Sequence, residues 1–219
     1  MGEHHPAFEQ YCEAIFELHE DDIDVIQARI AERLDISRPA VSEMIRRMAD
    51  EGLVRVAGGS IGLTEAGTAL AETIVRRHRL AERFLTDVLG LSWAEAHREA
   101  GRWEHVLSPS VEAAMTRVLG DPTTCPHGNP IPGSPYREPS HAVPMSQVAV
   151  GARFTVRRIT EELEFTPGVL DYLEASAITP GATATLLSSA PDGSLVVRVG
   201  DADVGLAAYA GGRILVTVD

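Results

Sequence analysis

Residues 26–63 contain the pattern that most constrains the fold: two short amphipathic helices separated by a tight turn and followed by a hairpin. The spacing predicts the first helix over Ile26–Leu34. Ser37 is a preferred N-cap for a second helix, which tolerates Pro39 in its first turn and ends at Gly52. Two short helices joined by a turn of about three to four residues indicate a helix-turn-helix.

The segments on either side extend this motif into a domain. Strands are expected at Leu53–Val56 and Ile61–Leu63, joined by a glycine-containing turn, which adds a wing to the helix pair. An amphipathic helix over Ala7–Glu20 precedes the pair, and Thr64 caps the helix that follows. We therefore predict a winged helix-turn-helix domain over residues 1–75.

The next region is predicted to be entirely helical. A long amphipathic helix runs from Glu65 to about Leu89, and Ser92–Glu95 forms a capping box for another helix. A last helix is expected over Ser108–Gly120. These helices offer more apolar surface than a small bundle buries, so we predict a helical metal-binding and dimerisation domain over residues 76–133.

The remainder of the chain changes from proline-rich loop to β-structure. Residues 120–150 hold seven of the thirteen prolines without periodicity, and we predict a linker, assigned as a domain boundary to 134–150. Residues 151–219 suit a small five-stranded barrel with one short helix capped by Thr166. The alternating segments are Arg153–Ile159, Thr183–Leu187, Leu195–Val199 and Ile214–Val218.

The charge of the chain is unevenly distributed. The net charge is −13, and all 19 basic residues are arginine. Residues 1–24 carry −8, residues 25–60 carry +1, and the remaining residues carry −6. Strong net acidity argues against nucleic acid as a partner, but the near-neutral helix-turn-helix segment does not. Solvated acidic helix faces and a coding bias toward arginine explain the same composition equally well.

Composition also limits the class of protein. No apolar run approaches about 18 residues, so no membrane span is expected. The polar N-terminus lacks the layout of a signal peptide. With only Cys12 and Cys125, a disulfide framework is excluded, and we expect a cytoplasmic protein.

Histidine and glutamate recur at helical spacing on two consecutive predicted helices. His78 and Glu82 lie four residues apart, and His97, Glu104 and His105 lie on one side of the next helix. Imidazole and carboxylate groups from packed helices are a usual way to hold a divalent transition metal. Histidines at this spacing are also common as ordinary polar residues, so the pattern alone leaves both interpretations open.

Other chemistry has weaker support. Cys125 and His127 place a thiol and an imidazole in one loop. The Ser, Cys and His residues show no spacing typical of a nucleophile and its base, and no glycine-rich phosphate loop is present. We therefore expect no enzymatic activity and no catalytic residues.

Four segments together resemble the family of diphtheria toxin repressors and iron-dependent regulators, over nearly the whole chain. They are Ala28–Leu34, Arg77–Arg83, Arg102–Val106 and Gly128–Pro132. The resemblance implies a mainly α fold with β: a winged helix-turn-helix domain, a helical dimerisation domain and a C-terminal SH3-like (FeoA-like) β-barrel. It implies a homodimer that binds a palindromic operator in double-stranded DNA. The corepressor it implies is Mn²⁺ or Fe²⁺, for which Co²⁺, Ni²⁺ or Zn²⁺ substitute in vitro.

The resemblance also implies metal ligands. Those of the ancillary site are His78, Glu82, His97, Glu161 and Glu164. Cys125 and His127 lie where manganese-sensing streptococcal relatives use the same Cys-Pro-His string to bind metal. These features lean toward manganese, whereas the Arg-Trp-Glu-His string leans toward iron.

The primary site departs from the family pattern. Glu104 and His105 match, but Gln10 replaces the usual Met or Asp, and Gly101 replaces the usual Cys or Glu. Glu13 matches a carboxylate ligand of the manganese-sensing branch and partly compensates. We expect the five-ligand ancillary site to be the better formed one.

The second helix of the motif is expected to contact bases with its N-terminal part. Arg38 is suited to a guanine or to a phosphate, and Glu43 stands where better-known relatives have Gln. The predicted DNA-binding residues are Arg29, Ser37, Arg38, Pro39, Ala40, Ser42, Glu43, Arg46, Arg47 and Arg55.

These features predict a metal-dependent transcriptional repressor that controls metal homeostasis genes. Without metal, the acidic first helix and the ligand carboxylates repel DNA and hold the two heads of the dimer at the wrong spacing. A metalloenzyme is a second class, but it needs an open coordination position and a substrate cleft. A winged-helix repressor with a structural metal site that senses a different ligand is the remaining alternative.

Overall fold

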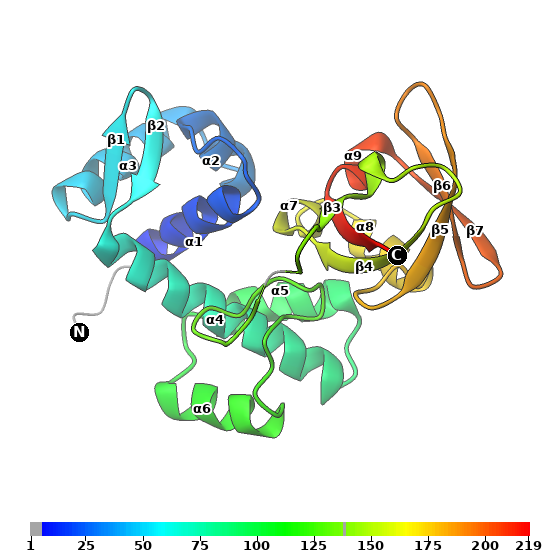
Figure 1. Cartoon of the computed structure of the whole chain (residues 1–219). Coiled ribbons are helices and arrows are strands. Elements are labelled where there is room, and N and C mark those ends of the chain that lie inside the picture. Colours follow the sequence, from blue (N-terminus) through cyan, green and yellow to red (C-terminus); the bar gives the residue numbers. More distant parts are fainter. Residues whose placement is uncertain (1–5, 138) are drawn as a thin grey trace.

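The N-terminal part of the chain forms the winged helix-turn-helix that the sequence predicts (Figure 1). The structure is a computed structural model that describes residues 6–137 and 139–219; the polar segment 1–5 lies outside the described residues. Ser37 caps its helix by accepting a hydrogen bond from the backbone nitrogen of Ala40 at 3.4 Å. The elements are α1 (Pro6–Glu20), α2 (Gln27–Leu34), α3 (Arg38–Asp50), β1 (Val54–Ala57) and β2 (Ser60–Leu63).

The wing is attached to the helices through one backbone contact and a shared core. The strands pair in antiparallel register from Val54 opposite Leu63 to Ala57 opposite Ser60. The backbone nitrogen of Ile61 donates to the carbonyl of Val25 at 2.8 Å, between α1 and α2. The buried side chains of this core include Ile15, Leu18, Ile30, Val41, Ile45 and Met48. This packing fixes the direction of α3 relative to α1.

The long helix α4 (Glu65–Asp87) connects the winged domain to a helical part that also contains α5 (Trp93–Trp103) and α6 (Pro109–Val118) (Figure 1). Each N-cap is the residue that the sequence predicts: Thr64, Ser92 and Ser108. The α4–α5 interface is built from small and medium apolar residues, Ala81, Leu85, Ala96 and Ala100, and Met115 of α6 packs against them. Small side chains at this interface bring the two helices close together.

Gly67 lies where the first turn of α4 meets the wing. A Cβ on Gly67 would lie 2.0 Å from the backbone oxygen of Leu53. We expect Gly67→Ala to lower the free energy of unfolding by about 1–3 kcal/mol, because the backbone must move to relieve the clash. Urea unfolding of the chelated protein measures this, with Gly101→Ala as the control in α5.

A Cβ on Gly101 meets no atom within 4 Å, so that control variant is expected to gain about 0.5–1 kcal/mol from helix propensity. Equal stability of the Gly67→Ala and Gly101→Ala proteins would contradict the packing described for α4 and the wing.

The predicted linker is wrong for residues 121–133, which form a buried loop against the C-terminal part. Thr124 bridges Pro130 in an antiparallel pair, and the side chains of Cys125, His127 and Ile131 are buried. The backbone nitrogen of Ile159 donates to the carbonyl of His127 at 2.8 Å. The side chains of the loop are buried by tertiary contacts. The loop forms neither a helix nor a strand, so its sequence shows no period.

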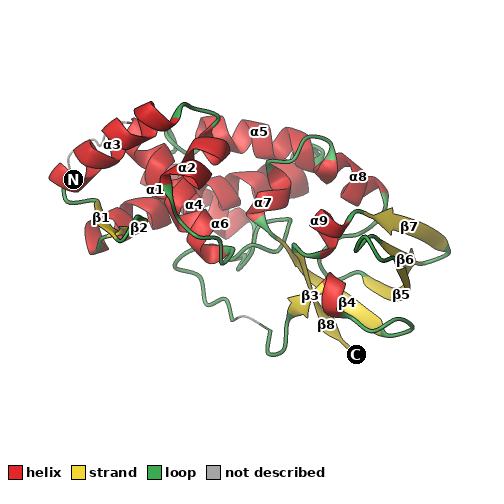
Figure 2. Ribbon diagram, turned by 90° about the horizontal axis from the view of Figure 1, so that it is seen from above, coloured by secondary structure: helices red, strands yellow, loops and turns green. Residues whose placement is uncertain are grey.

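The C-terminal part is an antiparallel sheet in the order β3-β8-β4-β5-β6-β7 (Figure 2). The SH3-like, FeoA-like class is confirmed, but six strands replace the predicted five, and within the described residues no pairing joins β3 to β7. The strands are β3 (Val143–Pro144), β4 (Arg153–Ile159), β5 (Thr183–Ser189), β6 (Leu195–Val199), β7 (Ala202–Leu206) and β8 (Ile214–Val218). The additional strand β3 comes from the segment predicted as linker, and the turn η1 (Met145–Gln147) follows it.

Short helices cover the sheet: α7 (Glu161–Glu164), α8 (Val169–Ala175) and α9 (Ala208–Gly211). The predicted cap of α8 is wrong, because Gly168 occupies the N-cap in the left-handed conformation and Thr166 donates its hydroxyl to the carbonyl of Glu162. Leu170 and Leu173 of α8 enter the core beside Phe154. Among the described helices, none combines the length and apolarity that crossing a membrane requires.

Ion pairs fix the C-terminal part against the winged domain, and Figure 2 shows α7 at the boundary between helices and sheet. Arg158 of β4 lies 2.5 Å from a carboxylate oxygen of Asp21. Arg33 of α2 contacts Glu17 at 2.8 Å and Glu162 at 2.9 Å. These contacts hold α7 beside α1 and α2.

Candidate metal centre

Metal-ligating side chains gather where α1, α4, α5, α7 and the buried loop meet, in three overlapping clusters. The first, which we call the central cluster, consists of His78, Glu82 and His97. The Glu82 Oε1 atom lies 3.0 Å from His97 Nδ1 and 3.3 Å from His78 Nε2. Glu82 is fully buried, because the i and i+4 positions of α4 face α5. The structure thus brings together three of the residues that their helical spacing singled out.

The second group, the loop cluster, consists of Glu82, Cys125 and His127. His127 Nδ1 lies 3.8 Å from Cys125 Sγ and 3.7 Å from Glu82 Oε1. Glu164 of α7 approaches the same imidazole nitrogen at 2.8 Å. The amide of Asn129 donates to the other oxygen of Glu164 at 2.7 Å, which holds the carboxylate in place.

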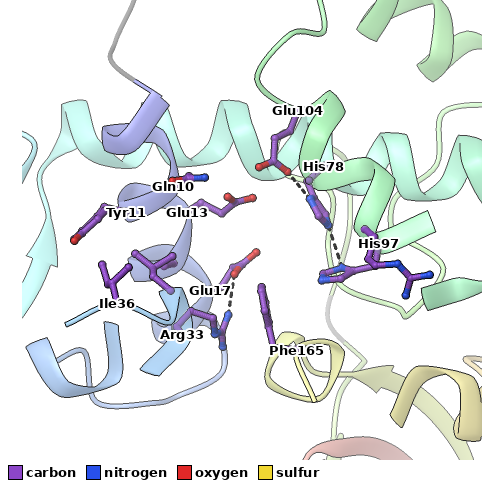
Figure 3. A pocket seen from close by; sticks show the side chains of 14 residues that line it. Gln10, Tyr11, Glu13, Glu17, Arg33, Ile36, His78, His97, Glu104 and Phe165 are labelled. Carbon is purple, nitrogen blue, oxygen red and sulfur yellow. Dashed lines mark hydrogen bonds and ion pairs between the residues drawn. The ribbon is translucent and has the colours of Figure 1, made fainter. Parts of the chain in front are cut away.

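The third group, the outer cluster, consists of Glu13, His78 and Glu104, and Figure 3 shows these side chains directed toward one another from α1, α4 and the end of α5. His78 Nδ1 lies 2.5 Å from Glu104 Oε2. This cluster borders a cavity of about 420 Å³ that Gln10 and Gly101 also line. Gly101 adds no side chain there, so the position at which the resemblance implies a ligand contributes only open space to the cavity.

His105 lies beside the outer cluster with a partner that the sequence analysis missed. Its Nδ1 atom is 2.7 Å from Glu9 Oε2, and its Nε2 atom is 3.2 Å from Glu104 Oε1. Glu9 precedes Glu13 by one turn of α1, and this spacing is the signal that points to it. Glu9 therefore competes with a metal for His105.

Glu161 is not a member of the three clusters, although it interacts electrostatically with Glu82, His78 and His97, and it is paired with Arg79. Its Oε1 atom is 2.8 Å from Arg79 Nη2 and 3.0 Å from Arg79 Nε. Arg79 also contacts Glu20 at 2.6 Å and donates to the carbonyl of Pro130. Of the two α7 glutamates that the resemblance implies, the structure brings Glu164 to His97 and His127. Glu161 pairs with Arg79 through Oε1, and its buried Oε2 has no hydrogen-bond partner among the described residues.

The clusters retain protons without a metal. Burial disfavours the cation of His78, but Glu82 and Glu104 outweigh it and raise the pKa of His78 well above its usual value. Burial, with Glu104 and Glu17, raises the pKa of Glu13. Burial, with Glu82, likewise raises the pKa of the Cys125 thiol. A metal must displace these protons, so metal affinity increases with pH.

The residues fit a divalent transition metal. Within the described part of the chain, Glu82 Oε2 and Glu161 Oε2 are buried carboxylate oxygens without a hydrogen-bond partner. Buried polar atoms are rarely left unpaired, so such atoms indicate a missing ligand. Imidazole, carboxylate and thiolate groups are suitable ligands for first-row divalent metals.

The predicted DNA-binding residues lie on the outer side of the winged domain. Those of the α3 cap and first turn, Ser37 to Ala40, are exposed, as are Glu43, Arg46 and Arg47, while Ser42 is half-buried. Arg29 and Arg55 are exposed on α2 and on the wing. Arg29 also forms an ion pair with Glu32 at 2.7 Å. The surface is thus open to a large polyanion.

Family models match almost the whole chain. The iron dependent repressor, N-terminal DNA binding domain, matches residues 5–60. The iron dependent repressor, metal binding and dimerisation domain, matches residues 64–133. The FeoA domain matches residues 143–218.

Similar proteins are repressors that depend on iron or manganese. The iron-dependent repressor IdeR of Mycobacterium tuberculosis is 40% identical over 217 residues, which cover 94% of each chain. The diphtheria toxin repressor of Corynebacterium diphtheriae is 49% identical over 126 residues, or 57% of this chain and 56% of that protein. A solved manganese-dependent transcriptional repressor in complex with manganese superposes with a TM-score of 0.85 and 32% identity, covering 97% of this chain and 100% of its own. ScaR with bound Zn²⁺ gives a TM-score of 0.78 and 27% identity over 95% and 98% of the two chains.

Proposed function

The chain belongs to the iron-dependent repressor family, and we propose from this that it represses transcription by binding DNA when a divalent metal is bound. The observation that carries the proposal is the outer cluster, in which Glu13 of the winged domain meets His78 and Glu104 of the helical domain. A ligand set shared by two domains fixes their relative position. The metal is Mn²⁺ or Fe²⁺, and Co²⁺, Ni²⁺ or Zn²⁺ can replace it in vitro.

We assign the metal ligands to two places. Glu13, His78 and Glu104 are the outer ligands, with Gln10 and His105 beside them. The loop ligands are Glu82, Cys125, His127 and Glu164. When bound, the cation supplies the positive charge that offsets the crowded carboxylates.

The chain's own residues explain why DNA binding depends on the metal. Without it, burial and the nearby carboxylates of Glu104 and Glu17 raise the pKa of Glu13, so that Glu13 keeps a proton. No metal then bridges the winged and helical domains at this contact. Bringing α1 against α4 and α5 sets the orientation of both α3 helices in a homodimer. Their spacing must match successive major grooves, which corresponds to a palindromic operator.

The DNA contacts divide into two kinds. We assign Arg38, Ser42 and Glu43 to base edges, because they lie in the N-terminal part of α3 and that part of a recognition helix enters the major groove. Arg29, Arg47 and Arg55 are placed for phosphates, each adding about 0.9 to the salt slope of binding. We propose domain limits of 1–75 and 76–133, followed by a linker that begins at 134 and ends before β3, where the C-terminal domain begins.

Anaerobic DNA binding with and without metal tests this function. A labelled duplex is recovered from a random library by selection with the Mn²⁺-loaded protein, and its affinity is measured by fluorescence anisotropy. We expect Mn²⁺ or Fe²⁺ to tighten binding about 5- to 150-fold over the chelated protein. Arg38→Gln should weaken DNA binding at saturating metal while leaving metal affinity unchanged. Equal affinity after exhaustive chelation, or failure to select any duplex, contradicts the proposal.

A further inference from the structure

The ring of Phe165 connects the metal centre to the helix-turn-helix. Phe165 is the C-cap of α7 and directly follows Glu164, one of the loop ligands. Figure 3 shows its ring between Arg33 of α2 and His97 of α5. The guanidinium carbon of Arg33 lies 4.4 Å from the ring centroid, and the ring centroids of Phe165 and His97 lie 5.2 Å apart with an angle of 88° between the ring planes. One side chain of the C-terminal part therefore contacts an imidazole of the central cluster and the first helix of the DNA-binding motif.

Burial in a hydrophobic core does not account for the position of Phe165. The residue is 47% exposed and belongs to none of the hydrophobic cores of the described residues. Phe165 and Arg33 both line the cavity beside the outer cluster and a second cavity of about 510 Å³ between α2 and the end of α7. The gain from burial scales with the apolar area removed from water, so a ring exposed to this extent gains little from it. Its contacts with Arg33 and His97 set its position.

Arg33 is held firmly enough to relate the ring to α2. Its side chain is only 2% exposed and forms ion pairs with Glu17 of α1 at 2.8 Å and with Glu162 of α7 at 2.9 Å. A guanidinium that has lost its water is attracted to an aromatic face more strongly than an exposed one. The α7 segment thus holds Arg33 through the carboxylate of Glu162 and through the ring of Phe165.

We propose that Phe165 is a positioning residue whose ring couples the position of Glu164 to Arg33 and thereby to α2. This inference rests on the proposed metal binding. His97 Nδ1 lies 3.2 Å from Glu164 Oε2, so the imidazole keeps the carboxylate and the ring in one arrangement. When Glu164 is fixed as a ligand, the next residue is fixed with it, and α2 loses freedom to move relative to α7. The outer cluster holds α1, whereas this contact holds α2.

Amide hydrogen exchange of the full chain without DNA, measured by mass spectrometry with and without Mn²⁺, tests this role. In the wild-type protein Mn²⁺ is expected to slow exchange in α2, in α4 and in the buried loop. Phe165→Leu keeps an apolar side chain but removes the ring. We expect this variant to reduce the Mn²⁺-dependent slowing in α2 about 5-fold, which corresponds to the loss of a cation–π contact of about 1 kcal/mol. The slowing in α4 and in the loop should stay at wild-type values.

Three further variants separate the ring contact from a general loss of structure. Tyr172→Leu is the matched control, because Tyr172 is 46% exposed in the same C-terminal part and bonds through its hydroxyl to Gly205. It should leave exchange in α2 unchanged. Phe165→Tyr keeps the ring and should retain the wild-type slowing. Arg33→Lys keeps the charge near Glu17 but lacks the planar group, so it should reproduce Phe165→Leu, and the double variant should show no additional loss.

Several results would overturn the inference. They are exchange in α2 that does not respond to Mn²⁺ in the wild-type protein, wild-type slowing of α2 in Phe165→Leu, and additive losses in the double variant. Isothermal titration calorimetry adds another, because a Phe165→Leu protein that loses a bound Mn²⁺ or binds it more than a few-fold more weakly would show that the ring supports the metal site itself. Metal-dependent DNA binding of the wild-type protein, measured separately, decides the proposed function whatever the result in α2.

Discussion

Glu82→Gln is expected to weaken metal binding about 100-fold or more and to abolish the effect of metal on DNA affinity. Substitutions that only orient a ligand typically cost about 10- to 100-fold, and Glu82 is placed to bind directly. Its carboxylate is fully buried, and its Oε1 atom lies within 3.7 Å of nitrogens from His78, His97 and His127. Isothermal titration calorimetry with Mn²⁺ and anisotropy with the selected duplex measure the two effects.

Glu72→Gln is the matched control, because Glu72 lies on the same helix but is exposed. It removes the same charge from α4 and should leave both affinities at wild-type values. If the Kd of Glu82→Gln for Mn²⁺ stays within a few-fold of the wild-type value, Glu82 is not a metal ligand. Circular dichroism of both variants confirms that any loss is not a loss of fold.

Arg79→Met is expected to lower the free energy of unfolding by about 3–5 kcal/mol, because it leaves the buried carboxylate of Glu161 without its partner. The Arg79 side chain is fully buried and pairs with Glu20 and Glu161. At about 2–4 °C per kcal/mol for a chain of this size, Tm should fall by roughly 6–20 °C. Thermal unfolding of the metal-free protein at neutral pH measures the change.

The double variant Arg79→Met with Glu161→Gln serves as the rescue test. Removing the charge at Glu161 should recover part of the lost stability, because a neutral amide is less costly to bury than an unpaired carboxylate. Additive losses in the double variant would show that Arg79 and Glu161 do not act as a pair. A single Arg79→Met loss below about 1 kcal/mol would place the pair among weak surface contacts.

The helices from α1 to α6 could be predicted because capping residues and hydrophobic spacing within each segment specify them. Ser37, Thr64, Ser92 and Ser108 each cap the helix that they were expected to cap. The wing follows from a short alternating pattern around glycines. Where capping chemistry and hydrophobic period agree, the element is specified by its own residues.

Other parts of the fold depend on contacts between distant segments. The loop around Cys125 has the composition of a linker, yet it is buried by hydrogen bonds such as that from Ile159 to His127. Strand β3 is only two residues long and exists because β8 pairs with it. Gly168 displaces Thr166 as the cap of α8 because its positive φ, 76°, suits the sharp entry into the helix.

The candidate metal centre shows the same division. Helical spacing alone groups His78 with Glu82 on one face of α4. The packing of α5 on α4 then brings His97 next to them. It does not reveal that Glu161 is held by Arg79, since those residues are 82 positions apart and meet only in the folded chain. The pairing of His105 with Glu9 likewise joins residues 96 positions apart. Helical spacing identifies candidate ligands within a helix. Tertiary structure decides whether another side chain of the protein pairs with them.

The loop cluster has a consequence for the lifetime of the protein. Its ligands come from α4, from the buried loop and, through Glu164, from the C-terminal part, so the unfolded chain has no such site. Metal at about 100 times its Kd would stabilise the native state by about 2.7 kcal/mol. In a metal-starved cell most of the protein is metal-free, and this less stable form unfolds more often and is degraded faster. Scarcity of metal is expected to reduce both the activity and the number of repressor molecules.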